Sequence, residues 1–103
     1  MSEIKYQVIV SDRASRMLIE QVAFMARVNA SAANKVKQAL LKALRSLETF
    51  PKRNPFFNEA YIPSNKYHKM YVEKYYLVLY QIIDTNVFVD YILDCRKEYD
   101  WLV

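Results

Sequence analysis

Apolar and polar residues alternate at the start of the chain and then change to a helical period. Residues 4–10 read Ile-Lys-Tyr-Gln-Val-Ile-Val, which predicts a strand with one buried face. From Arg13 to Val28 the apolar residues recur every three or four positions. This spacing predicts an amphipathic helix, for which Ser11 or Asp12 can serve as the N-cap.

A second helix is predicted from a cap at Ser31 to about Thr49. It ends at Phe50, because Pro51 disfavours helical backbone in the residue before it. Basic side chains lie off its apolar stripe, which consists of Val36, Leu40, Ala43, Leu44 and Leu47. Two helices with a short break and matching apolar faces indicate an antiparallel helical hairpin.

The second half of the chain is β-rich. Strands are predicted over 67–72, 75–83 and 87–93, with turns at 73–74 and 84–86. The strand 75–83 is apolar on both faces, as expected for a covered central strand. Residues 51–65 form a loop, in which we expect the adjacent Phe56 and Phe57 to lie on the core.

The predicted order is β-α-α-β-β-β with a short C-terminal element, in one domain over residues 1–103. It corresponds to an α+β fold. A largely antiparallel sheet, built on a three-strand meander, carries the helical hairpin on one face. We expect its other face to be free for a partner or substrate.

Composition removes several classes of site. The chain has 103 residues, 53% of them apolar, which suits one modest core. It has no glycine, so a glycine-rich phosphate loop is excluded. One cysteine, Cys95, and one histidine, His68, exclude an intramolecular disulfide and a multi-histidine metal site. We expect neither a metal nor a cofactor.

Charge is uneven along the chain, whose net charge is +4. Residues 31–60 carry six Lys or Arg and two Asp or Glu, whereas residues 81–103 carry two and five. A basic middle segment favours RNA, DNA or an acidic partner, and the alternative is a solvated helix face. The sequence contains no apolar signal core and no run of transmembrane length, so we expect a cytoplasmic protein with no membrane partner.

Several strings, in the same order, resemble the RelE/ParE toxin superfamily of bacterial type II toxin–antitoxin systems. The second predicted helix ends in Leu-Glu-Thr-Phe-Pro over 47–51, similar to the superfamily's L-x-x-x-P helix end. Residues 76–84, Tyr-Leu-Val-Leu-Tyr-Gln-Ile-Ile-Asp, resemble its Y-R-L-V-Y-x-V central strand. Residues 92–97 resemble the strand that ends in a small residue and a basic pair.

The resemblance implies a toxin that arrests growth, serves functions such as plasmid stabilisation, and is neutralised by a cognate antitoxin. RelE-like members cut mRNA in the ribosomal A site, whereas ParE-like members inhibit DNA gyrase and lack the nuclease residues. The two activities share one fold, so the fold does not decide between them.

Metal-free RNA cleavage needs a proton acceptor, a proton donor and positive charge beside the phosphate. In the nucleases, the arginine of the central strand binds the phosphate, but here that position is Leu77. His68 lies where RelE-like toxins carry a catalytic lysine and is the best general acid–base candidate. The resemblance places Arg96 and Lys97 at the superfamily's C-terminal basic pair, and Tyr99 near its C-terminal aromatic residue. The alternative is an edge histidine, solvated charges and a packing tyrosine.

Basic residues also interleave with the tyrosines of the β-rich half. This pattern suits contact with nucleic acid, although tyrosine-rich strands are also ordinary sheet material. The candidate nucleic-acid-binding residues are Lys52, Arg53, Lys66, Lys69 and Lys74.

The sequence therefore predicts a type II toxin, first as a divergent, ribosome-dependent mRNA endoribonuclease. A non-catalytic inhibitor of DNA gyrase is the alternative, together with an inactive remnant that binds only antitoxin. The expected partners are the antitoxin, with the ribosome and mRNA or with gyrase. A homodimer or a toxin–antitoxin hetero-oligomer is compatible with these partners.

Overall fold

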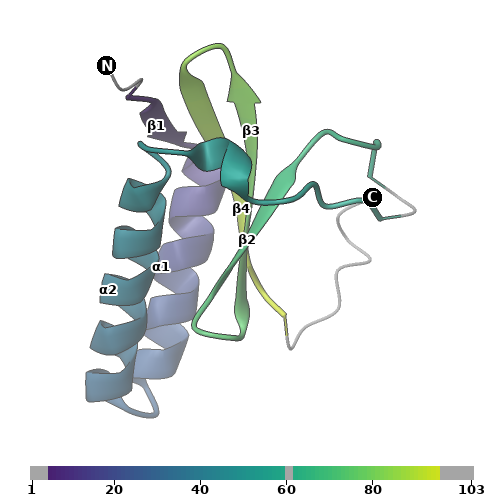
Figure 1. The fold of residues 1–103 in the computed structure, drawn as a ribbon. Coiled ribbons are helices and arrows are strands. Elements are labelled where there is room, and N and C mark those ends of the chain that lie inside the picture. The colour runs from purple at the N-terminus through teal and green to yellow at the C-terminus, as the bar shows by residue number, and fades with distance from the viewer. Residues whose placement is uncertain (1–4, 60–61, 96–103) are drawn as a thin grey trace.

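The computed structural model describes residues 5–59 and 62–95. Its elements follow the predicted order, which confirms the α+β fold. They are β1 (Gln7–Val10), α1 (Asp12–Ala26), α2 (Ala30–Ser46), the 3₁₀ turn η1 (Pro51–Arg53), β2 (His68–Val72), β3 (Tyr76–Ile83) and β4 (Asn86–Asp94). The two helices lie side by side against the sheet, and the segment around η1 passes in front of the strands in the view of Figure 1.

The sheet has four strands in the order β1-β4-β3-β2. β2, β3 and β4 form the predicted antiparallel meander, and β1 pairs with β4 in parallel. A bulge interrupts the pairing of β3 with β4, because Leu79 lies opposite Tyr91 whereas Tyr80 lies opposite Val89. The extra residue is Asp90, whose carboxylate is part of the site described below.

The first helix begins as predicted, but the second begins earlier. The backbone N–H of Ala14 donates to Oγ of Ser11 at 3.0 Å, so Ser11 is the N-cap of α1. For α2 the prediction of Ser31 was wrong. The backbone N–H of Ala32 donates to Oδ1 of Asn29 at 2.9 Å, and Asn29 has the extended backbone of an N-cap. Asparagine caps helices as well as serine does, so the earlier residue takes the position.

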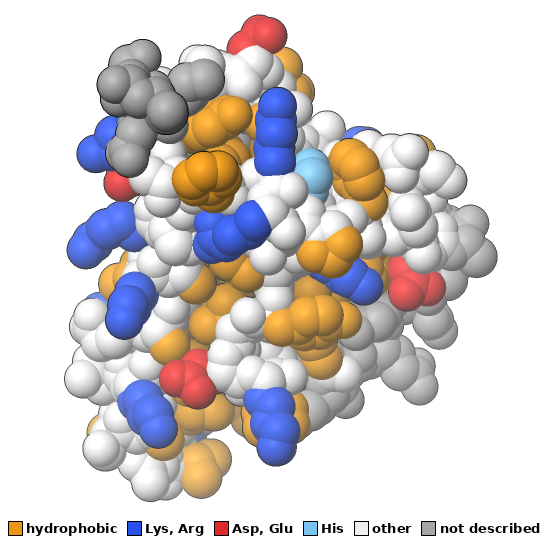
Figure 2. All heavy atoms as spheres, viewed as in Figure 1, with side chains coloured by type: hydrophobic (Ala, Val, Ile, Leu, Met, Phe, Trp, Pro, Cys, Tyr) orange, Lys and Arg blue, Asp and Glu red, His pale blue; other side chains and the backbone are white. Residues whose placement is uncertain are grey.

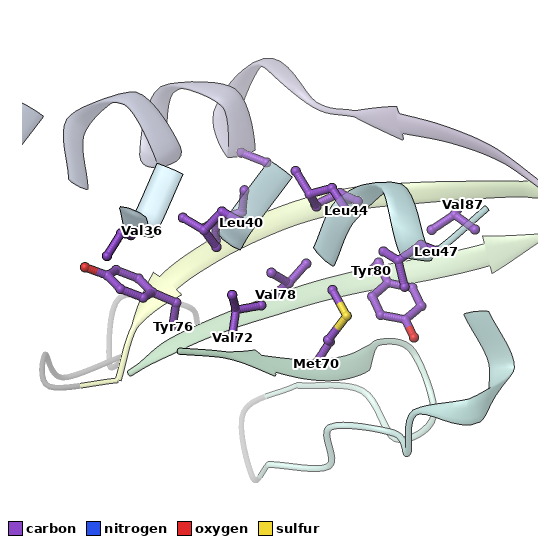
Figure 3. Close-up of a cluster of buried hydrophobic side chains, with 13 residues drawn as sticks. Val36, Leu40, Leu44, Leu47, Met70, Val72, Tyr76, Val78, Tyr80 and Val87 are labelled. Atoms are coloured by element: carbon purple, nitrogen blue, oxygen red, sulfur yellow. The ribbon is translucent and has the colours of Figure 1, made fainter. Parts of the chain in front are cut away.

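The helical hairpin packs on the sheet through the predicted stripe of α2. Leu40 and Leu47 are fully buried against side chains from the sheet such as Val78 and Tyr80 (Figure 3). Two apolar residues expected on the inner face of the first helix are instead exposed. Phe24, near the end of α1, is 64% exposed, and Val28, which follows the end of α1, is 82% exposed. No helix among residues 5–59 and 62–95 is long and apolar enough to cross a membrane.

The centre of the sheet's other face is covered, which corrects the expectation of a free face. Leu77, Leu79 and Leu93 form a second buried cluster with loop residues Phe57, Ile62 and Tyr67. The backbone N–H of Phe57 donates to the carbonyl of Tyr67 at 2.7 Å, which ties the two ends of this loop together. Phe57 thus lies on the core as predicted, whereas Phe56 remains 40% exposed.

Candidate functional site

His68 begins β2, and its imidazole ring lies between two aromatic rings. The centroid of Phe56 is 4.2 Å away on one side, and that of Tyr80 is 5.4 Å away at an interplanar angle of 14°. Nδ1 of His68 is 2.7 Å from the carbonyl oxygen of Asn54. Because a carbonyl only accepts, Nδ1 carries the hydrogen, and Nε2 is left as the atom that can exchange a proton.

Tyr80, whose ring stacks on that of His68, is fully buried. Its hydroxyl donates to the carbonyl of Pro51 at 2.5 Å and accepts from Nδ2 of Asn54 at 2.9 Å. Burial raises the pKa of this hydroxyl, and the hydrogen bond from Asn54 and the charge of Arg53 oppose the rise. Tyr80 therefore holds the loop in place, and its hydroxyl is not available as a second proton-transfer group for His68.

Arg53 points back to the helix that precedes it. Its guanidinium donates to the carbonyls of Ser46, Thr49 and Phe50 at 3.4, 3.0 and 2.9 Å, and to Oγ of Ser46 at 2.8 Å. A cation at this position satisfies carbonyls that the helix end leaves without a partner. The Arg53 side chain thus caps the C-terminus of α2.

The other candidate lysines do not gather at one place. Lys52 is exposed on η1, and Lys69 is half-buried on β2 with its backbone N–H donating to the carbonyl of Pro55 at 2.9 Å. The ammonium of Lys66 lies 5.3 Å from the ring centroid of Tyr67. Lys74 lies in the turn at the far end of β2, about 20 Å of extended chain from His68. Lys52 thus lies on η1, Lys66 and Lys69 lie at the start of β2, and Lys74 follows its end.

Leu77, the position of the nuclease arginine in the resemblance, is 0% exposed in the second cluster. Two hydrogen bonds close the loop over this cluster. The hydroxyl of Tyr67 donates to Oδ2 of Asp90 at 2.9 Å, and Nε2 of Gln81 donates to the same oxygen at 3.0 Å. Burial, followed by the bond to Asp90, raises the pKa of the Tyr67 hydroxyl. The hydroxyl thus remains protonated and keeps the loop closed.

Three of the predicted site residues, Arg96, Lys97 and Tyr99, lie outside the described residues. Within the described part of the chain, no three His, Cys, Asp or Glu side chains gather as metal ligands would. Sequence reasoning missed Asn54 and Phe56, the direct neighbours of His68. The dipeptide Asn54-Pro55 signals a turn, but no local pattern indicates that this turn packs against β2.

Comparison with known proteins agrees with this fold. The family described as ParE toxin of type II toxin–antitoxin system, parDE, matches residues 8–99. The chain belongs to the ParE toxin family of type II toxin–antitoxin systems. None of the curated proteins gives a significant match.

A solved structure shows the same ParE-type fold. It is described as a chromosomal ParDE TA system from P. aeruginosa and is similar with a TM-score of 0.73 at 10% sequence identity. The match covers 87% of this chain and 96% of that one. This ParE toxin therefore keeps the fold of that protein with few of its residues.

Proposed function

We propose that this ParE toxin inhibits DNA gyrase by binding it and does not cleave RNA. The observation that carries the proposal is the position of Leu77, which is fully buried beneath Phe57, Ile62 and Tyr67. A nuclease of the related RelE type uses this strand position to hold a phosphate. Here the position is apolar and the chain's own loop covers it, so neither charge nor space is available for RNA at this point.

The surroundings of His68 support the same proposal. Its two faces are occupied by Phe56 and Tyr80, and its Nδ1 is held by the Asn54 carbonyl. Arg53, which directly precedes Asn54 in the loop, directs its guanidinium to the end of α2. General acid–base cleavage needs two proton-transfer groups and a phosphate ligand, and these contacts provide one such group.

Toxins of this family belong to modules with an antitoxin, so we also propose a cognate antitoxin as partner. We expect one of its segments to bind as an amphipathic helix or an added strand across the helical hairpin and the sheet. Val28 at the tip of the hairpin and Tyr71 on the edge strand β2, which are 82% and 57% exposed, support this arrangement. Both gyrase and such an antitoxin would be met in the cytoplasm.

The deciding experiment uses the folded toxin, freed from its antitoxin, in two assays. We expect it to block supercoiling of relaxed plasmid by purified gyrase, and added antitoxin to restore the reaction. We expect primer extension on a defined mRNA to show no new ends, with or without translating ribosomes. Normal supercoiling at excess toxin would reject gyrase as the target.

The ribosome-dependent endoribonuclease expected from the sequence is the second candidate. One observation favours it, namely that the Nδ1 contact leaves Nε2 of His68 able to accept a proton. Cuts that appear only with ribosomes would support this candidate. In that case, His68→Ala or Arg96→Ala should relieve growth arrest while antitoxin binding persists.

A further inference from the structure

Phe50 lies at the junction of α2 and η1, where its backbone conformation and the exposure of its ring are both unfavourable. Its backbone is left-handed, with φ 53° and ψ 49°, and its side chain is 80% exposed. A left-handed backbone brings the β carbon of any residue but glycine close to the following carbonyl oxygen. The Phe50 side chain belongs to neither buried cluster, so packing within the toxin does not account for its presence.

The residues around Phe50 hold it rigidly in this state. The guanidinium of Arg53 donates to the Phe50 carbonyl at 2.9 Å and to the carbonyl of Thr49 at 3.0 Å. The next residue, Pro51, is buried, and its carbonyl accepts from Tyr80. A backbone that is already fixed in the free toxin need not be ordered again on binding, which is a property of an interface anchor.

The chemistry beside Phe50 is basic and aromatic. Lys52 is exposed two residues along, and Phe56 is 40% exposed next to His68. Figure 2 shows the histidine among basic and hydrophobic side chains. A surface of this kind complements an apolar pocket bordered by carboxylates.

Single-stranded nucleic acid fits the same surface less well. Stacking of bases needs several open aromatic faces beside cations that reach the phosphates. One face of Phe56 is occupied by His68, and the guanidinium of Arg53 donates to Ser46 at the end of α2. The groups that remain exposed are the apolar ring of Phe50 and the nearby Lys52. This combination favours a protein partner.

We propose that Phe50, held outward by Arg53 and flanked by Lys52, is the anchor that inserts into an apolar, acid-bordered pocket of the toxin's target protein. This inference rests on the proposed function, because the target is then gyrase. Arg53 is a positioning residue that acts through Phe50.

The first test is the toxin concentration that half-inhibits supercoiling by purified gyrase. Phe50→Ala should raise it about tenfold or more, and Lys52→Glu should raise it with a dependence on salt. Ile19→Ala, which truncates a 63% exposed side chain on α1, is the matched control and should change nothing. Inhibition by Phe50→Ala at the wild-type concentration would overturn the inference.

A second variant separates function from stability. Phe50→Gly removes the strain and the ring together, so its melting temperature should equal or exceed that of the wild type while inhibition is lost. A double-mutant cycle tests the positioning role of Arg53. Arg53→Ala should weaken inhibition of supercoiling when it is made in the wild-type toxin, but it should cause no further loss when it is made in the Phe50→Ala variant. Full additivity would reject the positioning role.

An assay of growth arrest in cells tests the anchor role of Phe50 even if gyrase is not the target. When wild-type toxin leaves supercoiling intact, the proposed function fails, but Phe50→Ala should still relieve arrest in cells and Ile19→Ala should not. Arrest by Phe50→Ala equal to the wild type would overturn the anchor alone. Loss of binding to a fluorescent oligothymidylate in Phe50→Ala, parallel to loss of arrest, would also overturn it in favour of nucleic acid.

Discussion

The hydroxyl of Tyr67, at the end of the loop, donates a 2.9 Å hydrogen bond to the carboxylate of Asp90 in the bulge of β4. Asp90 lies in this position because the bulge adds one residue opposite Leu79 and Tyr80. The bond joins the loop to the far strand of the meander and closes the sheet's second face over Leu77. It links the bulge to the covering of Leu77 by the loop.

Tyr67→Phe should lower the free energy of unfolding by about 1 kcal/mol at neutral pH, because Asp90 loses one donor. Chemical denaturation followed by circular dichroism measures this difference. Asp90 keeps the bond from Gln81, so the variant should remain folded. A loss above about 3 kcal/mol would show that the bond does more than close the loop.

Stability should fall as the pH rises above about 10, the ordinary pKa of tyrosine. The pKa values of Tyr67 and Tyr80 are both raised in the folded state, mainly by burial. The unfolded chain therefore loses these protons first, and deprotonation favours unfolding. Each tyrosine contributes up to about 1.4 kcal/mol per pH unit above that point. Melting curves from pH 8 to 11.5 measure the effect, and Tyr67→Phe should show a shallower decline.

Leu77→Arg, which restores the arginine of the nuclease pattern, should destabilise the toxin by about 3 kcal/mol or more. The charge would be buried among apolar side chains without a partner. Leu77→Met is the control of similar volume and should cost less than about 1.5 kcal/mol. A soluble, equally stable Leu77→Arg protein would mean that the loop opens readily.

His68→Phe should preserve toxicity, because a phenyl ring can occupy the space between Phe56 and Tyr80. We expect half-inhibition of gyrase within about threefold of the wild type, and a loss of about 1 kcal/mol in stability from the missing bond to Asn54. His68→Ala should be less stable, since it leaves a gap between the rings. If His68→Phe folds but no longer arrests growth, the imidazole has a chemical role.

Lys74→Gly should stabilise the fold by about 0.5–1 kcal/mol, or several degrees in melting temperature. Lys74 has φ 73° in the turn between β2 and β3, a backbone state that glycine adopts without strain. Thr85→Gly in the turn before β4 is the control, because Thr85 is not among the residues with positive φ and glycine there should destabilise. Equal effects of both changes would contradict the strain argument.

The elements of this fold were predictable because their signals are local. The period of the apolar residues, Ser11 before α1 and Pro51 after α2 all act within a few positions. The prediction of Ser31 as the N-cap of α2 was wrong, because Asn29 and Ser31 are both good caps and only the geometry of the connection distinguishes them. The departure at Leu77 was also visible in the sequence, and the structure places this side chain in a buried cluster.

The candidate site depended on contacts between distant residues. The ring of His68 meets Asn54 and Phe56 from a loop that local patterns show only as irregular. The sequence identifies Arg53 only as a surface cation, and the structure shows that it also donates to the helix end seven residues before it. The exposure of Phe50 could not be foreseen, since an aromatic residue before a proline is equally compatible with burial.

The sequence by itself determined the order of strands and helices, the buried stripe of α2 and the absence of glycine-rich, disulfide and multi-histidine sites. These follow from residue periodicity and composition, which need no knowledge of distant contacts. Only the tertiary structure decided that the loop covers the second face of the sheet, that His68 lies between two rings and that Phe50 points outward. Each of these depends on which of several apolar surfaces the loop packs against, and that choice is made by the free energy of the whole core.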